Sequence, residues 1–116
     1  MPLLDDFLNL GIDTLIGVDP LEGKGTDLGI IREKLGGKIC LWGGVNGFLT
    51  IERGNEKEVE EAVEKAISIL GPRGFILSPV DSVTDNSSKT WNNVKVMIKT
   101  WQRKVKELVR ASKQKL

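Results

Sequence analysis

Three apolar segments of this 116-residue chain end in the same way, and their spacing limits the folds that are available to it. The segments read LIGVD, LWGGVN and ILSPVD, and each ends with a valine followed by Asp19, Asn46 or Asp81. These ends lie 27 and 35 residues apart, which suits one strand plus one crossover helix. The pattern predicts three parallel β-strands that each end at a polar residue.

Helical patterns fill the segments around these strands. Asn55 and Glu58 match the two partners of a capping box, and Gly71 closes the apolar stripe that follows them. The alternation of helix and strand, at this length, indicates one α/β domain spanning residues 1–116. The expected helices cover residues 3–10, 27–35, 55–70 and 91–111.

One face of the expected sheet should be bare, because right-handed crossovers place all connecting helices on the other face. Counting back by twos from the strand ends assigns Leu15, Trp42, Phe75 and Leu77 to the bare face. Leaving each of them in water forfeits about 1.5–3 kcal/mol. The opposite, helix-covered face would hold Ile12, Ile16, Val18, Ile39, Leu41, Val45, Ile76 and Val80.

A closed barrel would supply the missing cover, because inward side chains from all of its strands fill its interior. An eightfold barrel typically needs about 250 residues. We therefore expect an α/β fold with a three-stranded parallel sheet and flanking helices, forming the C-terminal part of a (β/α)8 TIM barrel. The rest of the barrel would lie on another chain, or identical copies would pack their bare faces together.

Composition excludes several classes of function. The chain has no histidine, so His-based triads and His-containing metal sites are excluded for this chain alone. Its net charge is only +1, and the basic residues of 95–116 alternate with apolar ones as on the wet face of a helix, so we expect neither nucleic acid nor membrane partners. The lone Cys40 fits a reducing, cytoplasmic setting, and core packing is favoured over a nucleophile or ligand.

Asp19, Asn46 and Asp81 are the candidate substrate-binding residues. Barrel enzymes place their chemistry at the carboxyl ends of the strands, where the loops converge over the barrel mouth. Each residue could equally cap the turn or helix that follows it. Taken together, three oxygen-bearing side chains on one rim favour binding of a polar small molecule, while a metal ion would need more ligands than these.

The chain resembles the carboxy-terminal part of the uroporphyrinogen decarboxylase family, which also contains cobalamin-dependent methyltransferases. The similarity runs over roughly residues 3–103, through LDDFLNLGIDTLIGVDP, DLGIIREKLGGKICLWGGVNG and EKEVEEAVEKAISILGPRGFILSPVDS. Asn46 and Gly47 stand where the family has the Asp-Pro of its Gly-Asn-x-Asp-Pro turn. Asp81 stands where relatives have a substrate-binding His or a zinc-ligating Cys. The resemblance implies a (β/α)8 barrel.

The resemblance also implies a chemistry, either decarboxylation of a tetrapyrrole side chain or corrinoid-linked methyl transfer to a thiol. Zinc and a corrinoid are the family's cofactors, and this chain alone is expected to hold none. We expect the domain to be incomplete as a catalyst by itself. The alternative is a non-catalytic scaffold, either a homo-oligomer or a subunit that completes a barrel with a separate N-terminal half-barrel.

Overall fold

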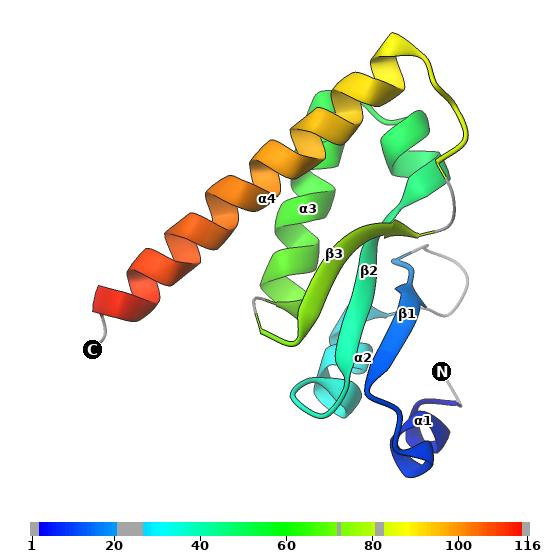
Figure 1. Cartoon of the computed structure of the whole chain (residues 1–116), viewed down its shortest axis with the longest axis vertical. Helices are drawn as coiled ribbons and strands as arrows, with labels where there is room; N and C mark the ends of the chain where they lie inside the picture. Colours follow the sequence, from blue (N-terminus) through cyan, green and yellow to red (C-terminus); the bar gives the residue numbers. More distant parts are fainter. Residues whose placement is uncertain (1–2, 21–26, 72, 81–82, 115–116) are drawn as a thin grey trace.

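The chain forms an α/β structure in which a three-stranded parallel sheet carries helices on one face (Figure 1). The computed structural model describes residues 3–20, 27–71, 73–80 and 83–114. Within these ranges, no helix is both long and apolar enough to cross a membrane. In chain order the elements are α1 (Leu4–Leu10), β1 (Thr14–Val18), α2 (Leu28–Leu35), β2 (Cys40–Asn46), the short π-helix η1 (Gly47–Glu52), α3 (Glu56–Leu70), β3 (Phe75–Val80) and α4 (Ser88–Gln114).

Local capping explains why the helices begin and end where they do. The side chain of Asp27 accepts hydrogen bonds from the backbone N–H groups of Gly29 and Ile30 at the start of α2. At α3 the predicted capping box is present, with Asn55 accepting from the Glu58 N–H and Glu58 accepting from the Asn55 N–H. The expected helix boundaries are therefore confirmed to within a few residues.

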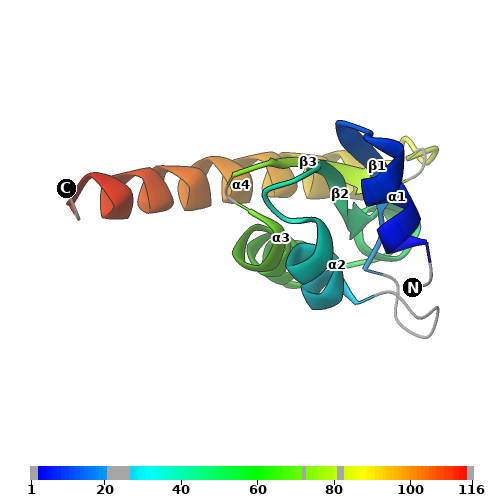
Figure 2. The same cartoon turned by 90° about the horizontal axis from the view of Figure 1, so that it is seen from below.

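The strand order is β1-β2-β3, as the sequence predicts, and α2 and α3 lie together on one side of the sheet (Figure 2). Two clusters of buried side chains fill the space between the sheet and these helices. The first lies under β1 and β2 and consists of Leu4, Val18, Leu28, Ile31, Leu35, Ile39, Leu41 and Leu70. The second joins β2, η1, α3 and α4 and consists of Val45, Ile51, Val59, Val63, Ile67 and Met97.

The second face of the sheet is open, as expected, but only part of its predicted composition is right. Trp42 lies on it and is 37% exposed. Its neighbours in register are Ile16 and Ile76, which are 67% and 42% exposed, whereas both were expected beneath the helices. The assignment of Leu15, Phe75 and Leu77 to this face was wrong, because all three pack against the buried clusters.

Irregular pairing at the carboxyl ends explains these errors. The register between β1 and β2 shifts between Ile16 and Val18, where Gly17 has a φ of 91°, so alternation does not carry through from Asp19. On β3 the residue opposite Asn46 is Val80 and not the expected Asp81. The alternation of side chains on β3 was therefore counted back from a residue one position too far along the chain. A one-residue offset moves every side chain of a strand to the other face.

The final helix α4 contacts both α3 and the segment from η1 to Gly54. Asn93 is buried, and its Nδ2 atom donates to the carbonyl oxygens of Ile51 and Gly54 at 2.9 and 2.8 Å. Arg103 donates to Glu64 at 2.8 Å, so an ion pair also joins α4 to α3. Because both of these charged side chains are exposed, we expect Asn93 to contribute more to stability than the ion pair does.

The close approach of β1 to β2 generates a prediction about Gly43, which has a φ of 141° and would place an added Cβ atom 2.6 Å from the Val18 carbonyl oxygen. Replacing Gly43 with alanine should lower the free energy of unfolding by roughly 2–5 kcal/mol, because backbone strain and a backbone clash add. Gly37→Ala is the control, since its φ is also positive, at 79°, but nothing lies within 4 Å of its added Cβ. Urea unfolding followed by circular dichroism measures both, and equal losses would contradict the register described for β1 and β2.

Candidate functional site

Two of the three predicted site residues meet at the carboxyl end of the sheet. The Nδ2 atom of Asn46 lies 3.2 Å from both carboxylate oxygens of Asp19 and donates to them. Both side chains are half-buried. Asp81 lies outside the described residues. The expected rim is therefore formed, as far as it is described, by an amide and a carboxylate from neighbouring strands.

Asn46 also has the capping role that was the alternative prediction. Its Oδ1 atom accepts a hydrogen bond from the backbone N–H of Leu49 at 2.6 Å, which holds the first turn of η1. With its amide donating to Asp19 and its oxygen accepting from Leu49, Asn46 is a positioning residue. The group it positions is the Asp19 carboxylate, which is the acceptor that the pair presents at this end of the sheet.

An aromatic ring and a cation lie at the same end, on η1 and directly after it. The guanidinium carbon of Arg53 lies 5.2 Å from the centre of the Phe48 ring, and both side chains are exposed. Neither residue was predicted from the sequence, because no motif marks them and the π-helix that brings them together was not expected. Their five-residue spacing matches the i→i+5 hydrogen bond of a π-helix, in which the Arg53 N–H donates to the Phe48 carbonyl oxygen at 3.2 Å.

A second polar cluster follows β3 and was also missed. Glu52 accepts hydrogen bonds from the backbone N–H groups of Thr84 and Asp85 at 2.9 and 2.6 Å. Asp85 in turn accepts from the hydroxyls of Ser87, at 2.6 Å, and of Thr90. The Ser87 hydrogen bond, followed by that from Thr90, lowers the pKa of the Asp85 carboxyl below its ordinary value of 3.8. This cluster shapes the connection into α4.

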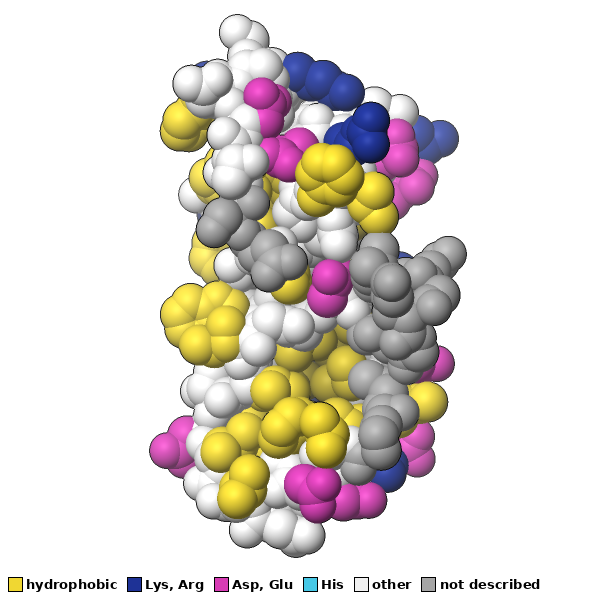
Figure 3. Space-filling model, turned by 90° about the vertical axis from the view of Figure 1, so that its right-hand side faces the viewer, with side chains coloured by type: hydrophobic (Ala, Val, Ile, Leu, Met, Phe, Trp, Pro, Cys, Tyr) yellow, Lys and Arg dark blue, Asp and Glu magenta, His cyan; other side chains and the backbone are white. Residues whose placement is uncertain are grey.

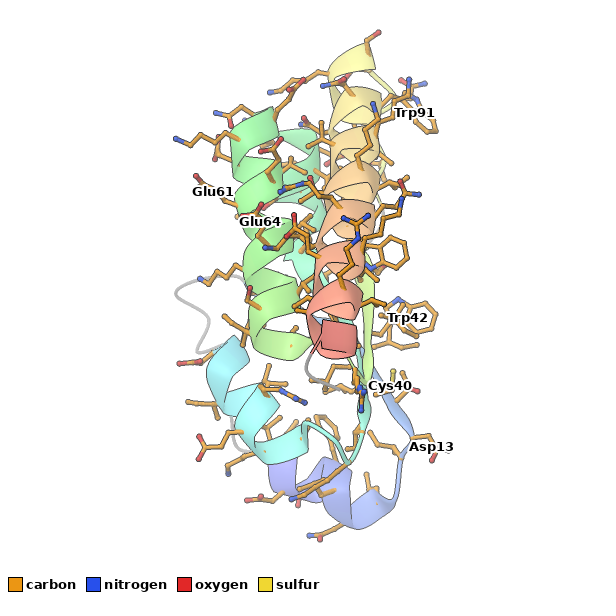
Figure 4. All side chains as sticks on the ribbon, turned by 90° about the vertical axis from the view of Figure 1, so that its left-hand side faces the viewer. Asp13, Cys40, Trp42, Glu61, Glu64 and Trp91 are labelled. Atoms are coloured by element: carbon orange, nitrogen blue, oxygen red, sulfur yellow. The ribbon has the colours of Figure 1, made fainter. Side chains whose placement is uncertain are left out.

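Cys40 lies at the other end of β2, on the side of the sheet from which Trp42 projects (Figure 4). The single thiol and the Asp19–Asn46 pair therefore lie at opposite ends of the strands. Throughout the part of the chain that the structure describes, no three His, Cys, Asp or Glu side chains gather as they would around a metal ion.

Comparison with protein-family models found no match, and comparison with curated proteins found none that was significant. The geometry of the rim is thus the basis for any functional proposal.

The Asp19–Asn46 pair can be tested by replacing Asn46 with aspartate, which turns the donor facing Asp19 into a second carboxylate. At neutral pH the repulsion and the lost hydrogen bonds should lower stability by about 1–3 kcal/mol. In acid, protonation should restore a hydrogen bond and narrow the difference from the wild-type protein. Asn46→Ala is the control, because it removes the same hydrogen bonds without adding a second carboxylate, so its loss should depend on pH less than that of Asn46→Asp. Melting temperatures recorded between neutral and acidic pH measure the stability lost by each variant. A loss for Asn46→Asp that does not change with pH would rule out the contact between Asp19 and Asn46.

The lowered pKa of Asp85 predicts how stability changes in acid. A carboxyl whose folded pKa is depressed stabilises the fold above its unfolded pKa, near 3.8, and this stabilisation is lost as the pH falls through the folded pKa. Asp85→Asn should therefore lower the melting temperature at neutral pH and have a smaller effect at strongly acidic pH. Asp6→Asn, at an exposed position of α1, controls for the loss of one charge. A difference that grows on acidification would contradict this assignment.

Proposed function

We propose that this chain is a barrel-type domain of the uroporphyrinogen decarboxylase kind, which binds a tetrapyrrole at the carboxyl end of its sheet. The observation that carries the proposal is the Asp19–Asn46 pair, which joins the ends of two adjacent parallel strands. Parallel α/β proteins bind ligands at this end of the sheet. Either a second copy of the chain or further βα units would complete the pocket, since the second face of the sheet is open.

The side chains at this end suit a ligand with a broad ring and carboxylate arms. A tetrapyrrole has N–H groups at its centre, and the Asp19 carboxylate can accept hydrogen bonds from them. The Phe48 ring offers an apolar surface, and the Arg53 guanidinium can form a two-pronged hydrogen bond with a carboxylate arm. An acceptor, an aromatic face and a cation are thus provided by β1 and by the segment from η1 to Arg53.

The proposed chemistry is the decarboxylation that the family resemblance implies, in preference to methyl transfer. A corrinoid shares the broad ring but carries mostly amide arms. The Arg53 guanidinium forms weaker hydrogen bonds with amides than with carboxylates. The residues described here bind and orient the ligand, and either a second copy of the chain or further barrel units would supply the rest of the pocket. We therefore expect the isolated chain to bind a carboxylated tetrapyrrole without turning it over.

A second candidate function is the non-catalytic scaffold, either oligomeric or a subunit that completes a barrel. The observation that favours it is the exposed row of Ile16, Trp42 and Ile76, which needs a cover whether or not the rim binds a ligand. A scaffold of this kind would show association without affinity for tetrapyrroles. Ligand binding is thus the property that separates the two candidates.

Calorimetric titration with uroporphyrinogen, kept reduced, tests the proposal. The wild-type chain should bind it more tightly than it binds cobalamin. Asp19→Asn and Arg53→Gln should each weaken binding by about tenfold or more, because each removes a charge-assisted hydrogen bond. Asp13→Asn is the matched control, since Asp13 is exposed and precedes β1 at the opposite end of the strand. No heat of binding, or equal losses from Asp13→Asn and Asp19→Asn, would overturn the proposal in favour of the scaffold.

A further inference from the structure

The open face of the sheet carries a continuous apolar row. Ile16, Trp42 and Ile76 are register partners on β1, β2 and β3, so they lie side by side across the sheet. Their exposed fractions are 67%, 37% and 42%. Figure 4 shows Trp42 projecting from the sheet on the side away from α2 and α3. The row is thus apolar, uncharged and open to solvent at the middle of the face.

Helix α4 extends this face beyond β3. In Figure 2 this helix lies beside the sheet, at its level, rather than in the layer of α2 and α3. Ile98 and Trp101 are 46% and 41% exposed. A groove of about 330 Å³ separates the helix from the strand and is lined by Phe75, Ile76, Leu77, Met97, Ile98 and Trp101. The apolar face therefore has a hollow on the β3 side.

The opposite, β1 side of the face carries its most exposed side chain. Ile16 is the most exposed residue of the row and lies on an edge strand. Figure 3 views the molecule from this edge and shows apolar side chains gathered over α1 and β1. One side of Trp42 thus carries an exposed isoleucine and the other side carries a groove.

A sheet that is all parallel is found almost only with both of its faces covered. This molecule measures 43 × 39 × 21 Å, and its short dimension is about that of one helix layer and one sheet layer. The open face therefore calls for a cover, and a stable interface would bury about 800 Å² on each partner.

An exposed apolar side chain on one side of the row and a groove on the other suit a self-complementary surface. In a two-fold dimer the same patch meets itself, so the exposed Ile16 side chain of each copy can meet the groove of the other copy. The five exposed side chains of the row and of α4 are uncharged, and the net charge of the chain is only +1, so two copies repel one another weakly. The shape and the charge of this face both favour a second copy as its cover.

We infer that two copies of this chain pack their open faces together around a two-fold axis that runs parallel to the strands. This direction places Ile16 of each copy over the groove between β3 and α4 of the other, with the two Trp42 side chains near the axis. An axis perpendicular to the strands would instead oppose Ile16 to Ile16. The parallel axis also brings the two Asp19–Asn46 rims to the same end of the dimer, where they would share one mouth.

The dimer rests on the proposed function only for the role of this shared mouth. If the chain dimerises but binds no tetrapyrrole, only the proposal about the ligand is overturned. If the chain is a monomer that binds a tetrapyrrole, only the dimer is overturned.

Sedimentation equilibrium of the purified chain at micromolar concentration should show a dimer. Ile16→Lys should raise the dissociation constant of the dimer by on the order of a hundredfold or more, because the substitution places an unpaired charge in the apolar groove of the other copy. Trp42→Asp should have the same effect, and both positions are exposed enough for the monomer to keep its fold, as circular dichroism would verify. Ile30→Lys, on an exposed position of α2, is the control and should leave the dimer intact. A monomeric wild-type chain, or a dimer unaffected by Ile16→Lys and Trp42→Asp, would overturn the inference and leave a different polypeptide as the cover.

Cross-linking decides the direction of the axis. In a Cys40→Ser background, Ile16→Cys and Ile98→Cys proteins are prepared separately, mixed, and treated with a short bis-maleimide. The parallel axis predicts a heterodimeric product in the mixture and little product from either protein alone. Efficient cross-linking of Ile16→Cys with itself would overturn this arrangement, because it requires the perpendicular axis.

Discussion

The handedness of the crossovers is the constraint on which the structure depends. Three parallel strands laid down in chain order, each joined to the next by a right-handed connection, must carry α2 and α3 on the same face. Helix packing therefore buries Leu41 and Val45 completely and leaves Trp42, between them on β2, partly in water. The same constraint aligns the carboxyl ends of the strands, which is why Asp19 and Asn46 can meet. The rim and the open face both follow from the connectivity.

Most of the architecture could be predicted because its signals are local. The capping box of Asn55 and Glu58 fixes where α3 begins through two hydrogen bonds between neighbours in sequence, and Asp27 does the same for α2. The strand order needed only the spacing of the three apolar segments and the crossover rule.

The parts that could not be predicted depend on backbone geometry between strands. A glycine with positive φ allows the alternation of side chains between the two faces of a strand to shift. The exposure of Ile16 therefore depends on Gly17 and on how closely β1 approaches Gly43. The pairing of Asn46 with Val80 is a register between segments far apart in sequence, and no local signal fixes it. The meeting of Asp19 with Asn46 was foreseeable from their place at the strand ends. The approach of Arg53 to Phe48 was not, since it needs a π-helix.

Asn93 has a consequence for how the protein is made. Its amide supplies the hydrogen bonds for the carbonyl oxygens of Ile51 and Gly54, which lie some forty residues earlier in the chain. Met97, from the same helix, closes the cluster around Val59 and Val63. During synthesis these contacts are therefore incomplete until α4 leaves the ribosome, and until then the nascent chain exposes the apolar side of α3. The emergence of α4 thus determines when the sheet and its helices can fold as a unit.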